Sequence, residues 1–311
     1  MIRVGLIGPA DRPEIQRLAM RIEERGAQPV ILDARNDPAI RLGRGRISAC
    51  GEDLAGLRGA YVVEMRLPAP CVRTPEGAVD PEGSRLALDR SRRHLAAWNA
   101  LLEHLARRIR IVNPPASHDV HFLKPFEVAA YERAGLPVPV TVSTTDPQSL
   151  AGLPEHLAGG WIRKGMVGGY THTESIELPR TADAAQVLTR QTPVLVQERI
   201  EGDNVRAFVL EDKVIGAAAV IPMGPSEIDS RRGDSRVQRI DLPDDAARTA
   251  IAAARRWGMP FSAVDFMLES GTGRFVLLES NSAPFFVNFE ARTGLDISGK
   301  LADYLIGRRS A

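Results

Sequence analysis

Cysteine is scarce in this chain of 311 residues, which contains only Cys50 and Cys71. The two form no Cys-x-x-Cys pair, so the spacing typical of zinc sites and of thiol redox motifs is absent. Nothing in the sequence marks a secretory route. We therefore expect a cytoplasmic protein that folds in a reducing compartment.

Long apolar runs and an excess of one charge are also missing. No run of about 18 apolar residues occurs, so we expect no membrane-spanning helix. The apolar segment Ile2–Ile7 is too short for the core of a signal peptide. Lys and Arg number 40 against 39 Asp and Glu, which gives a net charge of +1 and no overall field attracting nucleic acid or a membrane surface.

Basic residues do gather in one region, which has the spacing of a long helix. Two interpretations stay open: a solvated helix face, or a surface that attracts an acidic substrate. The residues concerned are Arg85, Arg90, Arg92, Arg93, Arg107, Arg108 and Arg110.

The length allows about two domains at roughly 150 residues each, and 44% apolar with 25% charged residues is typical of globular proteins. Ile2–Ile7 is a predicted strand, Glu14–Arg25 a helix that ends at Gly26, and Pro29–Leu32 a second strand. Strand, helix and strand within about thirty residues indicate a βαβ unit and therefore a parallel sheet. Further elements are predicted at 61–64 (strand), 68–83 (loop), 84–108 (helix) and 109–112 (strand).

The remainder of the chain reads as strands and hairpins with few helices, which indicates an α+β region. One helix runs to Arg133; it begins either at Asp119 as a cap or at Lys124, where Pro125 suits the first turn. A second helix is predicted at Ala246–Trp257. Strands are predicted at 138–143, 160–164, 194–198, 205–210, 214–220, 262–269 and 274–280.

The last predicted hairpin carries two carboxylates inside apolar strands. Antiparallel pairing about a turn near residue 272 places Asp265 opposite Glu279, and Asn281 then points to the same face as Glu279. Like charges in opposition are unfavourable unless a cation lies between them, and three oxygen donors suit Mg²⁺. The alternative is a pair of solvated carboxylates on an outer sheet face.

No Walker A motif accompanies this hairpin. The segment Gly294–Lys300 has the glycine spacing, but Leu301 stands where Ser or Thr should reach Mg²⁺, and no strand precedes it. Gly5-Leu-Ile-Gly8 is not a dinucleotide fingerprint either and is predicted to be the turn of a βα unit. The histidines His118 and His121 are too few for a zinc site.

Lysines are better candidates for phosphate contacts, because most basic residues are arginines. Lys124 opens a predicted helix, and Lys164 ends a predicted strand before the glycine-rich segment 165–169, which contains Gly168 and Gly169. A lysine at a strand end can reach phosphates while the backbone N–H groups of such a loop cover them. A surface lysine is the alternative interpretation of each.

A third polar group surrounds the end of the strand 194–198. Gln197 and Glu198 offer acceptors for an adenine amino group, and Asp203 and Asn204 follow within reach of a ribose. Arg206 begins the next strand and could bind a transferring phosphoryl group. Ordinary hairpin polarity is the alternative.

Together these motifs resemble the ATP-grasp superfamily, and within it the RimK-like and glutathione-synthetase-like carboxylate–amine ligases. The resemblance covers about 113–305. It is most specific in Lys124 to Pro139, in Val196-Gln-Glu-Arg-Ile-Glu-Gly-Asp-Asn-Val-Arg206, in Leu278-Glu279-Ser-Asn281-Ser-Ala-Pro284 and in Phe289 to Lys300. Two departures are present: the segment after Lys164 lacks the longer Gly-Ser-rich pattern, and Asn204 stands where the family carries an acidic residue.

The resemblance implies a Rossmann-like pre-ATP-grasp domain (1–112), a small ATP-grasp subdomain (113–195) and a C-terminal subdomain (196–311). It implies the following site residues: Lys124, Lys164, Gly168 and Gly169 at the phosphates; Gln197, Glu198 and Ile200 at the adenine; Asp203 at the ribose; Asp265, Glu279 and Asn281 at Mg²⁺; and Arg206 and Arg236 at the transferring group, with Arg231 and Arg232 as alternatives to Arg236.

The function implied is an ATP-dependent ligase that forms an amide through an acyl-phosphate, with Mg²⁺ as cofactor and Mn²⁺ as an alternative. Its substrates would be a small-molecule or peptide carboxylate and an amine, for example glutamate added to a cofactor, peptide or protein, with no nucleic acid or membrane partner. A homo-oligomer is left open. Two rival functions are a nucleotide-binding regulatory protein without ligase activity and a phosphotransferase built on the same fold.

Overall fold

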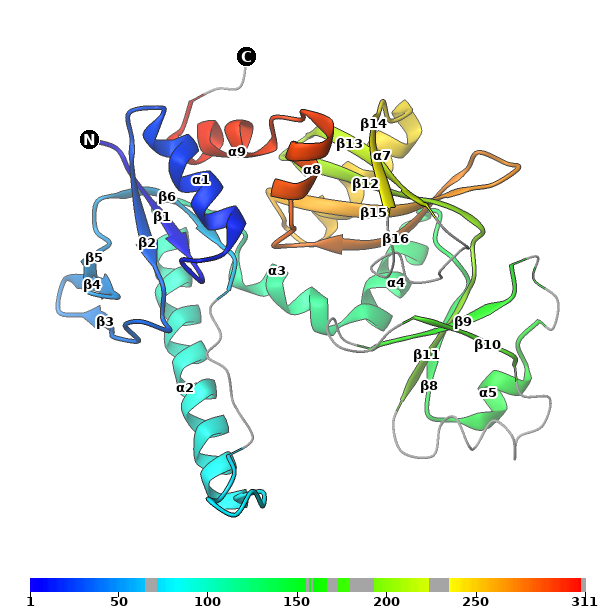
Figure 1. Cartoon of the computed structure of the whole chain (residues 1–311), viewed down its shortest axis with the longest axis horizontal. Helices are drawn as coiled ribbons and strands as arrows, with labels where there is room; N and C mark the ends of the chain where they lie inside the picture. The colour runs from blue at the N-terminus through cyan, green and yellow to red at the C-terminus, as the bar shows by residue number, and fades with distance from the viewer. Residues whose placement is uncertain are drawn as a thin grey trace. The chain divides into compact units, whose positions relative to one another are not determined.

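The computed structural model describes residues 1–64, 72–154, 157, 159–166, 173–178, 193–223 and 235–308. These form two compact units (Figure 1): Met1–Pro115 with Phe285–Val287 and Asp296–Ala311, and Ala116–Pro284 with Asn288–Leu295. The first boundary lies close to the predicted one at residue 112. The C-terminal segment, by contrast, groups with the first unit, and the two predicted ATP-grasp subdomains lie together in the second.

The first unit is built on a four-stranded parallel sheet. Its strands are β1 (Arg3–Ile7), β2 (Gln28–Leu32), β6 (Leu57–Val62) and β7 (Arg110–Val112), in the order β2-β1-β6-β7. The predicted βαβ unit is present as β1, α1 (Pro13–Glu23) and β2. Gly8 follows β1 at the turn into α1, as the βα interpretation of Gly5-Leu-Ile-Gly8 requires.

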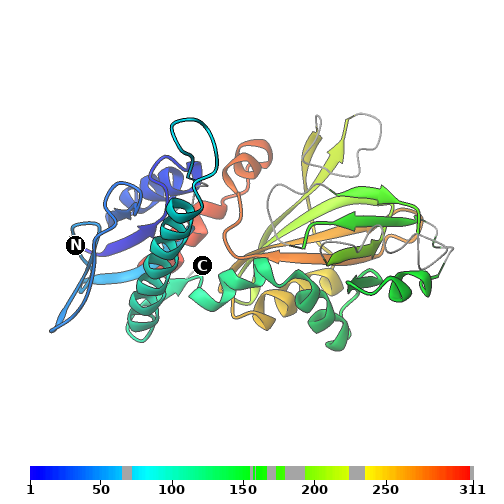
Figure 2. The same ribbon diagram turned by 90° about the horizontal axis from the view of Figure 1, so that it is seen from below.

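Helices cover both faces of this sheet. The long helix α2 (Pro81–Ala106) lies on one face and α1 on the other (Figure 2). Only the second half of α2 is buried, through Trp98, Leu101, Leu102 and Leu105, which pack against the sheet. The arginines along and after α2 are exposed, as both interpretations of that basic region require, so the choice between them stays open.

A small antiparallel sheet between β2 and β6 was not predicted. It contains β3 (Ile40–Gly43), β4 (Arg46–Ala49) and β5 (Glu52–Asp53). Ile40–Gly43 and Arg46–Ala49 do alternate apolar with polar residues, but strands of two to four residues are too short for this alternation to identify them, and only Ile47 and Ala49 are buried.

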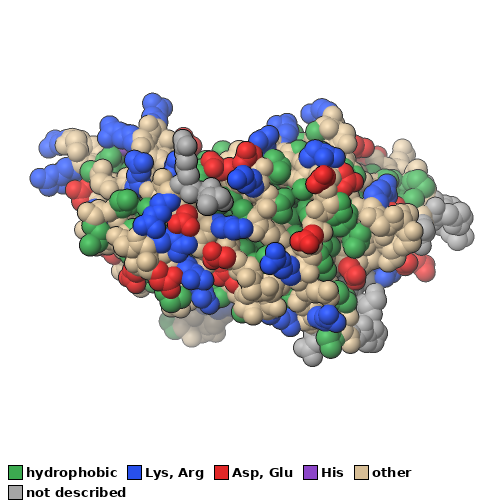
Figure 3. Space-filling view, turned by 90° about the horizontal axis from the view of Figure 1, so that it is seen from above, with side chains coloured by type: hydrophobic (Ala, Val, Ile, Leu, Met, Phe, Trp, Pro, Cys, Tyr) green, Lys and Arg blue, Asp and Glu red, His purple; other side chains and the backbone are tan. Residues whose placement is uncertain are grey.

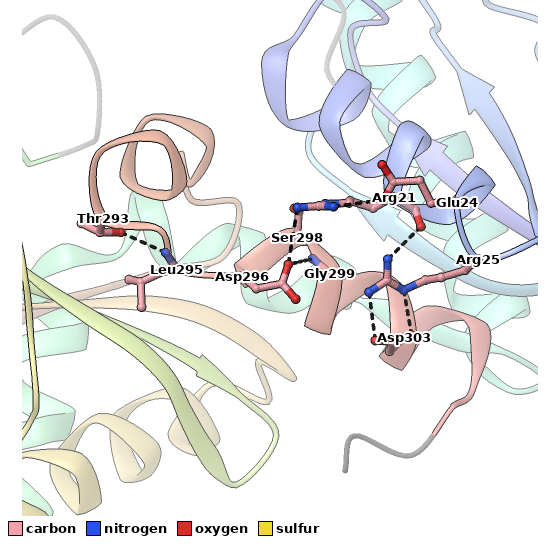
Figure 4. Close-up of polar contacts among 9 residues, drawn as sticks. All are labelled: Arg21, Glu24, Arg25, Thr293, Leu295, Asp296, Ser298, Gly299 and Asp303. Atoms are coloured by element: carbon pink, nitrogen blue, oxygen red, sulfur yellow. Dashed lines mark hydrogen bonds and ion pairs between the residues drawn. The ribbon is translucent and has the colours of Figure 1, made fainter.

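The helix α9 (Ile297–Ile306) completes the first unit by packing on α1. Arg25 of α1 donates two hydrogen bonds to the carboxylate of Asp303, at 2.8 and 3.1 Å (Figure 4). Asp296 caps α9 by accepting from Gly299 N–H, and a Cβ at Gly299 would collide with that carboxylate. The segment Gly294–Lys300 is therefore a capped helix start after α8 (Val287–Thr293), as the rejection of a Walker A motif requires.

The second unit contains a five-stranded antiparallel sheet in the order β14-β13-β12-β15-β16. Its strands are β12 (Gly202–Leu210), β13 (Lys213–Pro222), β14 (Ser235–Ile240), β15 (Phe261–Glu269) and β16 (Phe275–Asn281). The helices α4 (Lys124–Arg133) and α7 (Asp244–Arg256) cover one face, where Tyr131 and three buried alanines of α7 meet Val205, Val264 and Phe266.

A second, four-stranded antiparallel sheet has the order β10-β9-β11-β8. It contains β8 (Thr141–Thr144), β9 (Trp161–Lys164), β10 (Glu174–Ile176) and β11 (Val194–Glu198), with α5 (Pro147–Ala151) beside it. Before this sheet, α3 (Pro115–Asp119) and the 3-10 turn η1 (Val120–Phe122) precede α4. The helix therefore begins at Lys124, and capping by Asp119 is wrong because Asp119 ends a separate short helix.

The surface agrees with the balanced composition. Figure 3 shows Lys and Arg side chains interspersed with Asp and Glu over the face in view, without a large area of one sign. Within the described part of the chain, no helix is both long and apolar enough to cross a membrane.

Candidate active site

The hairpin of β15 and β16 places the two predicted carboxylates opposite each other. Asp265 pairs with Glu279, and Ala263 pairs with Asn281, so all three candidate metal ligands share one sheet face. Asn281 Nδ2 donates to Asp265 Oδ2 at 3.0 Å. Beyond Asp265 the ladder shifts by one residue, with Phe266 opposite Leu277, so Leu278 is an extra residue in β16 next to Glu279.

Strand alternation explains why charged side chains appear on this face of a buried sheet. Val205 and Ala207 of β12 point into the core under α7, so Arg206 points to the other side. Arg206 lies directly opposite Asp265 and donates Nε to Oδ1 at 2.7 Å and a terminal NH₂ to Oδ2 at 2.8 Å. Burial lowers the pKa of Arg206, but the attraction of Asp265 outweighs it and leaves this pKa above its ordinary value.

Lys124 at the start of α4 approaches the second carboxylate. Its Nζ lies 2.9 Å from Glu279 Oε2. Burial by itself would raise the pKa of Glu279, yet the attraction of Lys124 and of Lys164 is stronger and lowers that pKa to about 2. Glu279 is therefore an anion at neutral pH, as a Mg²⁺ ligand must be.

Lys164 at the end of β9 belongs to the same cluster. Its Nζ donates to Gln197 Oε1 at 3.3 Å, and Gln197 Nε2 in turn donates to Thr141 Oγ1 at 2.9 Å. Burial lowers the pKa of Lys164, against the attraction of Glu279. Lys164 is therefore not an open surface lysine, and its contact with phosphate stays a prediction.

The donor set fits a magnesium ion shared with a nucleotide. Among the described residues no group of three or more His, Cys, Asp or Glu side chains could hold a metal by itself. Asp265, Glu279 and Asn281 supply two carboxylates and one amide, which leaves several positions of an octahedral ion to phosphate and water oxygens. With Arg206, Lys124 and Lys164 counted, the cluster has three formal positive charges against two negative ones, which suits a polyanion.

The predicted adenine residues lie at the exit of β11. Gln197 is buried beside Lys164, and Ile200 is buried two residues beyond the strand. Glu198 exchanges two bonds with the backbone of Val140: its N–H donates to Val140 O at 2.8 Å, and its Oε2 accepts from Val140 N–H at 3.1 Å. Their contact with adenine stays a prediction.

The predicted ribose residue Asp203 lies in β12, where it pairs with Leu268, which packs against the core under α7. Alternation therefore turns Asp203 away from the face that carries Arg206, and Asn204 is the residue that shares this face. The contact of Asp203 with a ribose stays a prediction, and Asn204 is a second candidate for it.

Arg236 also lies on the other face of the sheet. It pairs with Ile221, which packs on the core side, and its guanidinium donates to Gln238 at 2.9 Å. Ala218, opposite Arg206, pairs with Arg239, so Arg239 is the arginine of β14 that shares the face of the site. The role predicted for Arg236 stays a prediction, and Arg239 is a second candidate for it because it shares the face of Arg206. Gly168, Gly169, Arg231 and Arg232 lie outside the described residues.

Sequence reasoning missed a buried acid next to the cluster. Glu127 of α4 is 2% exposed, and its Oε1 accepts from Ser280 N–H at 2.7 Å and from Tyr131 OH at 2.9 Å. Burial raises the pKa of Glu127 to about 8. The available signal was its spacing: Glu127 stands one turn after Lys124 and four residues before Tyr131, on one side of a short helix.

Comparison with known proteins agrees with this geometry. The sequence matches the RimK-like ATP-grasp domain over residues 133–305. It is 31% identical over 182 residues to a probable alpha-L-glutamate ligase of Pseudoalteromonas translucida, a match that covers 56% of this chain and 59% of that protein. The chain therefore matches less than two thirds of the length of these curated relatives.

Solved structures match along almost the whole chain. The ATP-grasp ligase PsnB complexed with a minimal precursor has a TM-score of 0.82 and 25% identity, covering 99% of this chain and 100% of that one. The same ligase with its minimal precursor, Mg and ADP has a TM-score of 0.78 and 26% identity, covering 98% and 97%. The predicted fold of a first α/β domain followed by an ATP-grasp α+β region is thus confirmed, and the chain belongs to the RimK-like ATP-grasp family.

Proposed function

We propose that this protein is an ATP-dependent carboxylate–amine ligase that releases ADP and phosphate. The observation that carries the proposal is the pair of carboxylates on one sheet face with their cations: Arg206 of the same sheet with Asp265, and Lys124 of α4 with Glu279, next to Lys164. Two carboxylates and an amide that can hold Mg²⁺, surrounded by three cations, form a site for a metal–triphosphate complex.

The residues have distinct tasks in this proposal. Lys124 and Lys164 bind the phosphates, and Asp265, Glu279 and Asn281 would hold Mg²⁺, for which Mn²⁺ can substitute at oxygen ligands. When bound, the metal neutralises charge on the phosphates. Arg206 lies beside these ligands, where its guanidinium can bind the transferring group.

The reaction divides into two substitutions. A substrate carboxylate oxygen attacks the γ-phosphorus, the bond to the β-phosphate oxygen breaks, and ADP leaves. An amine then attacks the carbonyl carbon of the acyl-phosphate, phosphate leaves, and the nitrogen loses a proton. The protein supplies positioning and charge and forms no covalent bond of its own, so the site needs no nucleophilic side chain.

We further propose that the carboxylate belongs to a peptide. The similarity to a ligase complexed with its precursor extends over the whole chain, whereas the match to glutamate ligases covers about half of it. A peptide substrate is therefore favoured over free glutamate and a small cofactor.

The test is an incubation with Mg²⁺-ATP and peptides containing acidic and lysine side chains, with and without free glutamate. Loss of one water from the peptide, with ADP and phosphate formed, supports an amide within the peptide. Gain of a glutamyl residue supports the glutamate alternative. Formation of AMP and pyrophosphate would contradict the acyl-phosphate route. Nucleotide binding without any turnover would favour the regulatory protein, and turnover without an amide would favour the phosphotransferase.

A further inference from the structure

Glu127 contacts the strand that carries two of the candidate metal ligands. Its Oε1 accepts from Ser280 N–H at 2.7 Å, and Ser280 lies between Glu279 and Asn281 in β16. β16 is an edge strand of the five-stranded sheet, so its outward N–H groups have no partner strand. Glu127 therefore satisfies a buried backbone donor that the sheet itself cannot satisfy.

The side chain of Ser280 lies on the side of β16 opposite the metal ligands. Consecutive side chains of a strand point to opposite faces, so Ser280 points towards α4 while Glu279 and Asn281 point towards the site. Tyr131 agrees with this direction, because its hydroxyl lies 2.7 Å from Ser280 Oγ. Glu127 at the backbone N–H and Tyr131 at the side chain of Ser280 therefore fix the backbone that orients both ligands.

A buried network fixes the acid in turn. Tyr131 OH donates to Glu127 Oε1 at 2.9 Å, and Trp257 Nε1 at the end of α7 donates to Tyr131 OH at 2.8 Å. Tyr131 and Ser280 are almost fully buried. Three elements, α4, β16 and α7, thus meet at one polar cluster inside an otherwise apolar core.

The helix α4 makes two contacts with β16, one turn apart. Lys124 pairs with the side chain of Glu279, and Glu127 binds the backbone of the next residue. A shift of α4 along β16 would have to break both. The pair of contacts sets where Lys124, Glu279 and Asn281 stand relative to one another.

We propose that Glu127 is a positioning residue, which holds Ser280 N–H against α4 and thereby orients Glu279 and Asn281 for the metal–nucleotide complex. The proposal rests on the function proposed above, because it assumes that these ligands bind Mg²⁺ with a nucleotide. It predicts that loss of the Glu127 acceptor weakens metal–nucleotide binding even where the protein stays folded.

The matched variants are Glu127→Gln and Glu127→Leu. Gln keeps an oxygen at the place where Oε1 accepts both hydrogen bonds, whereas Leu fills similar space without an acceptor. Calorimetric titration with ADP is carried out at fixed Mg²⁺, and Mg²⁺ is titrated at fixed ADP, so that no ligase turnover is needed. Thermal unfolding in EDTA is measured for each variant.

We expect Glu127→Leu to weaken Mg²⁺-ADP binding about tenfold, the effect of losing roughly one hydrogen bond at a buried donor. Glu127→Gln should bind within about threefold of the wild type, because its amide oxygen can accept both hydrogen bonds. Equal binding by wild type and Glu127→Leu would overturn the proposal, as would equal weakening by both variants.

If Glu127→Leu does not fold, Tyr131→Phe serves instead. It leaves the bond from Ser280 N–H to Glu127 but removes the hydroxyl that holds the carboxyl. Weakened Mg²⁺-ADP binding in a folded Tyr131→Phe protein supports positioning, and unchanged binding contradicts it. A wild type that binds no Mg²⁺-ADP at all would contradict the proposed function itself, which separates the two failures.

Discussion

Arg206 and Asp265 stand directly opposite each other on β12 and β15, and their guanidinium and carboxylate form two parallel hydrogen bonds of 2.7 and 2.8 Å. Glu279 forms a single ion pair with Lys124 at the start of α4, at 2.9 Å. The like-charge opposition of Asp265 and Glu279 is therefore offset by two cations before any metal binds. Removal of either carboxylate should therefore alter the stability of the metal-free protein through the cation that it leaves unpaired.

We expect Asp265→Ala to destabilise the metal-free protein by about 1–3 kcal/mol, because Arg206 keeps a largely buried charge without its bidentate partner. The sequence alone shows only the repulsion between Asp265 and Glu279, and therefore predicts that the same change leaves the free energy of unfolding unaltered or slightly raised. Urea unfolding in EDTA distinguishes the two. The control is the double variant Arg206→Met with Asp265→Leu, which removes both charges and should recover part of the loss. An Asp265→Ala protein as stable as the wild type would refute the paired-charge account.

Lys124→Met should reduce affinity for Mg²⁺-ATP by about tenfold or more, since one charge-assisted phosphate contact is lost and Glu279 loses its partner. Lys213→Met is the matched control, because Lys213 is exposed at the start of β13 and pairs with Leu210. Binding of a non-hydrolysable ATP analogue, followed by calorimetry, measures both. Equal affinities for the two variants would remove Lys124 from the site.

In the last hairpin, counting outwards from a turn centred near residue 272 predicted Asp265 opposite Glu279, and the structure contains this pair. The pairs nearer the turn, from Leu268 with Phe275 to Phe266 with Leu277, are one residue out of that count. Leu278 is the extra residue between the turn and Glu279, and it brings the two carboxylates back into register. The agreement at the metal-ligand candidates therefore depends on a bulge, which is a property of the ladder that the apolar pattern does not show.

Faces were harder to predict than strands. Asp203 and Arg236 were selected as chemically suitable residues close to the right place in the chain, yet each is one or three positions out of phase with the face of the site. Phase depends on which side of β12 and β14 packs on α7, a tertiary contact that the residues of the two strands do not reveal by themselves. Glu127 was missed for a related reason, since its partner Ser280 is 153 residues away.

The faces of β14 give a prediction about its arginines. Arg239 lies two strands from Arg206 on the same face, a separation of roughly 10 Å between strand axes, whereas Arg236 lies on the α7 side. We expect Arg239→Ala to lower the turnover number by about tenfold or more, as does removal of one charge-stabilising donor, and Arg236→Ala to leave it close to that of the wild type. Steady-state ADP release measures both. A stronger effect from Arg236→Ala would restore the original assignment.

The final prediction concerns how stability depends on pH. Burial raises the pKa of Glu127 to about 8 from its ordinary 4.5, with Glu279 raising it further and Tyr131 and Lys124 acting in the opposite direction. At pH values below 4.5 the carboxyl is protonated in both the folded protein and the unfolded chain, and its stabilising contribution is complete. As the pH rises towards 8, the unfolded chain releases this proton while the folded protein keeps it, so the free energy of unfolding falls.

Glu127→Gln cannot release a proton and should lack this slope. We therefore expect the Tm of the wild type to fall relative to that of Glu127→Gln between about pH 5 and 8, measured in EDTA so that no metal alters the neighbouring carboxylates. Groups other than Glu127 titrate alike in both proteins, so the difference in Tm isolates this carboxyl. Parallel plots of Tm against pH for the two proteins would mean that Glu127 ionises at its ordinary pKa. A wild-type Tm that rises relative to that of Glu127→Gln would mean that the folded protein favours the anion.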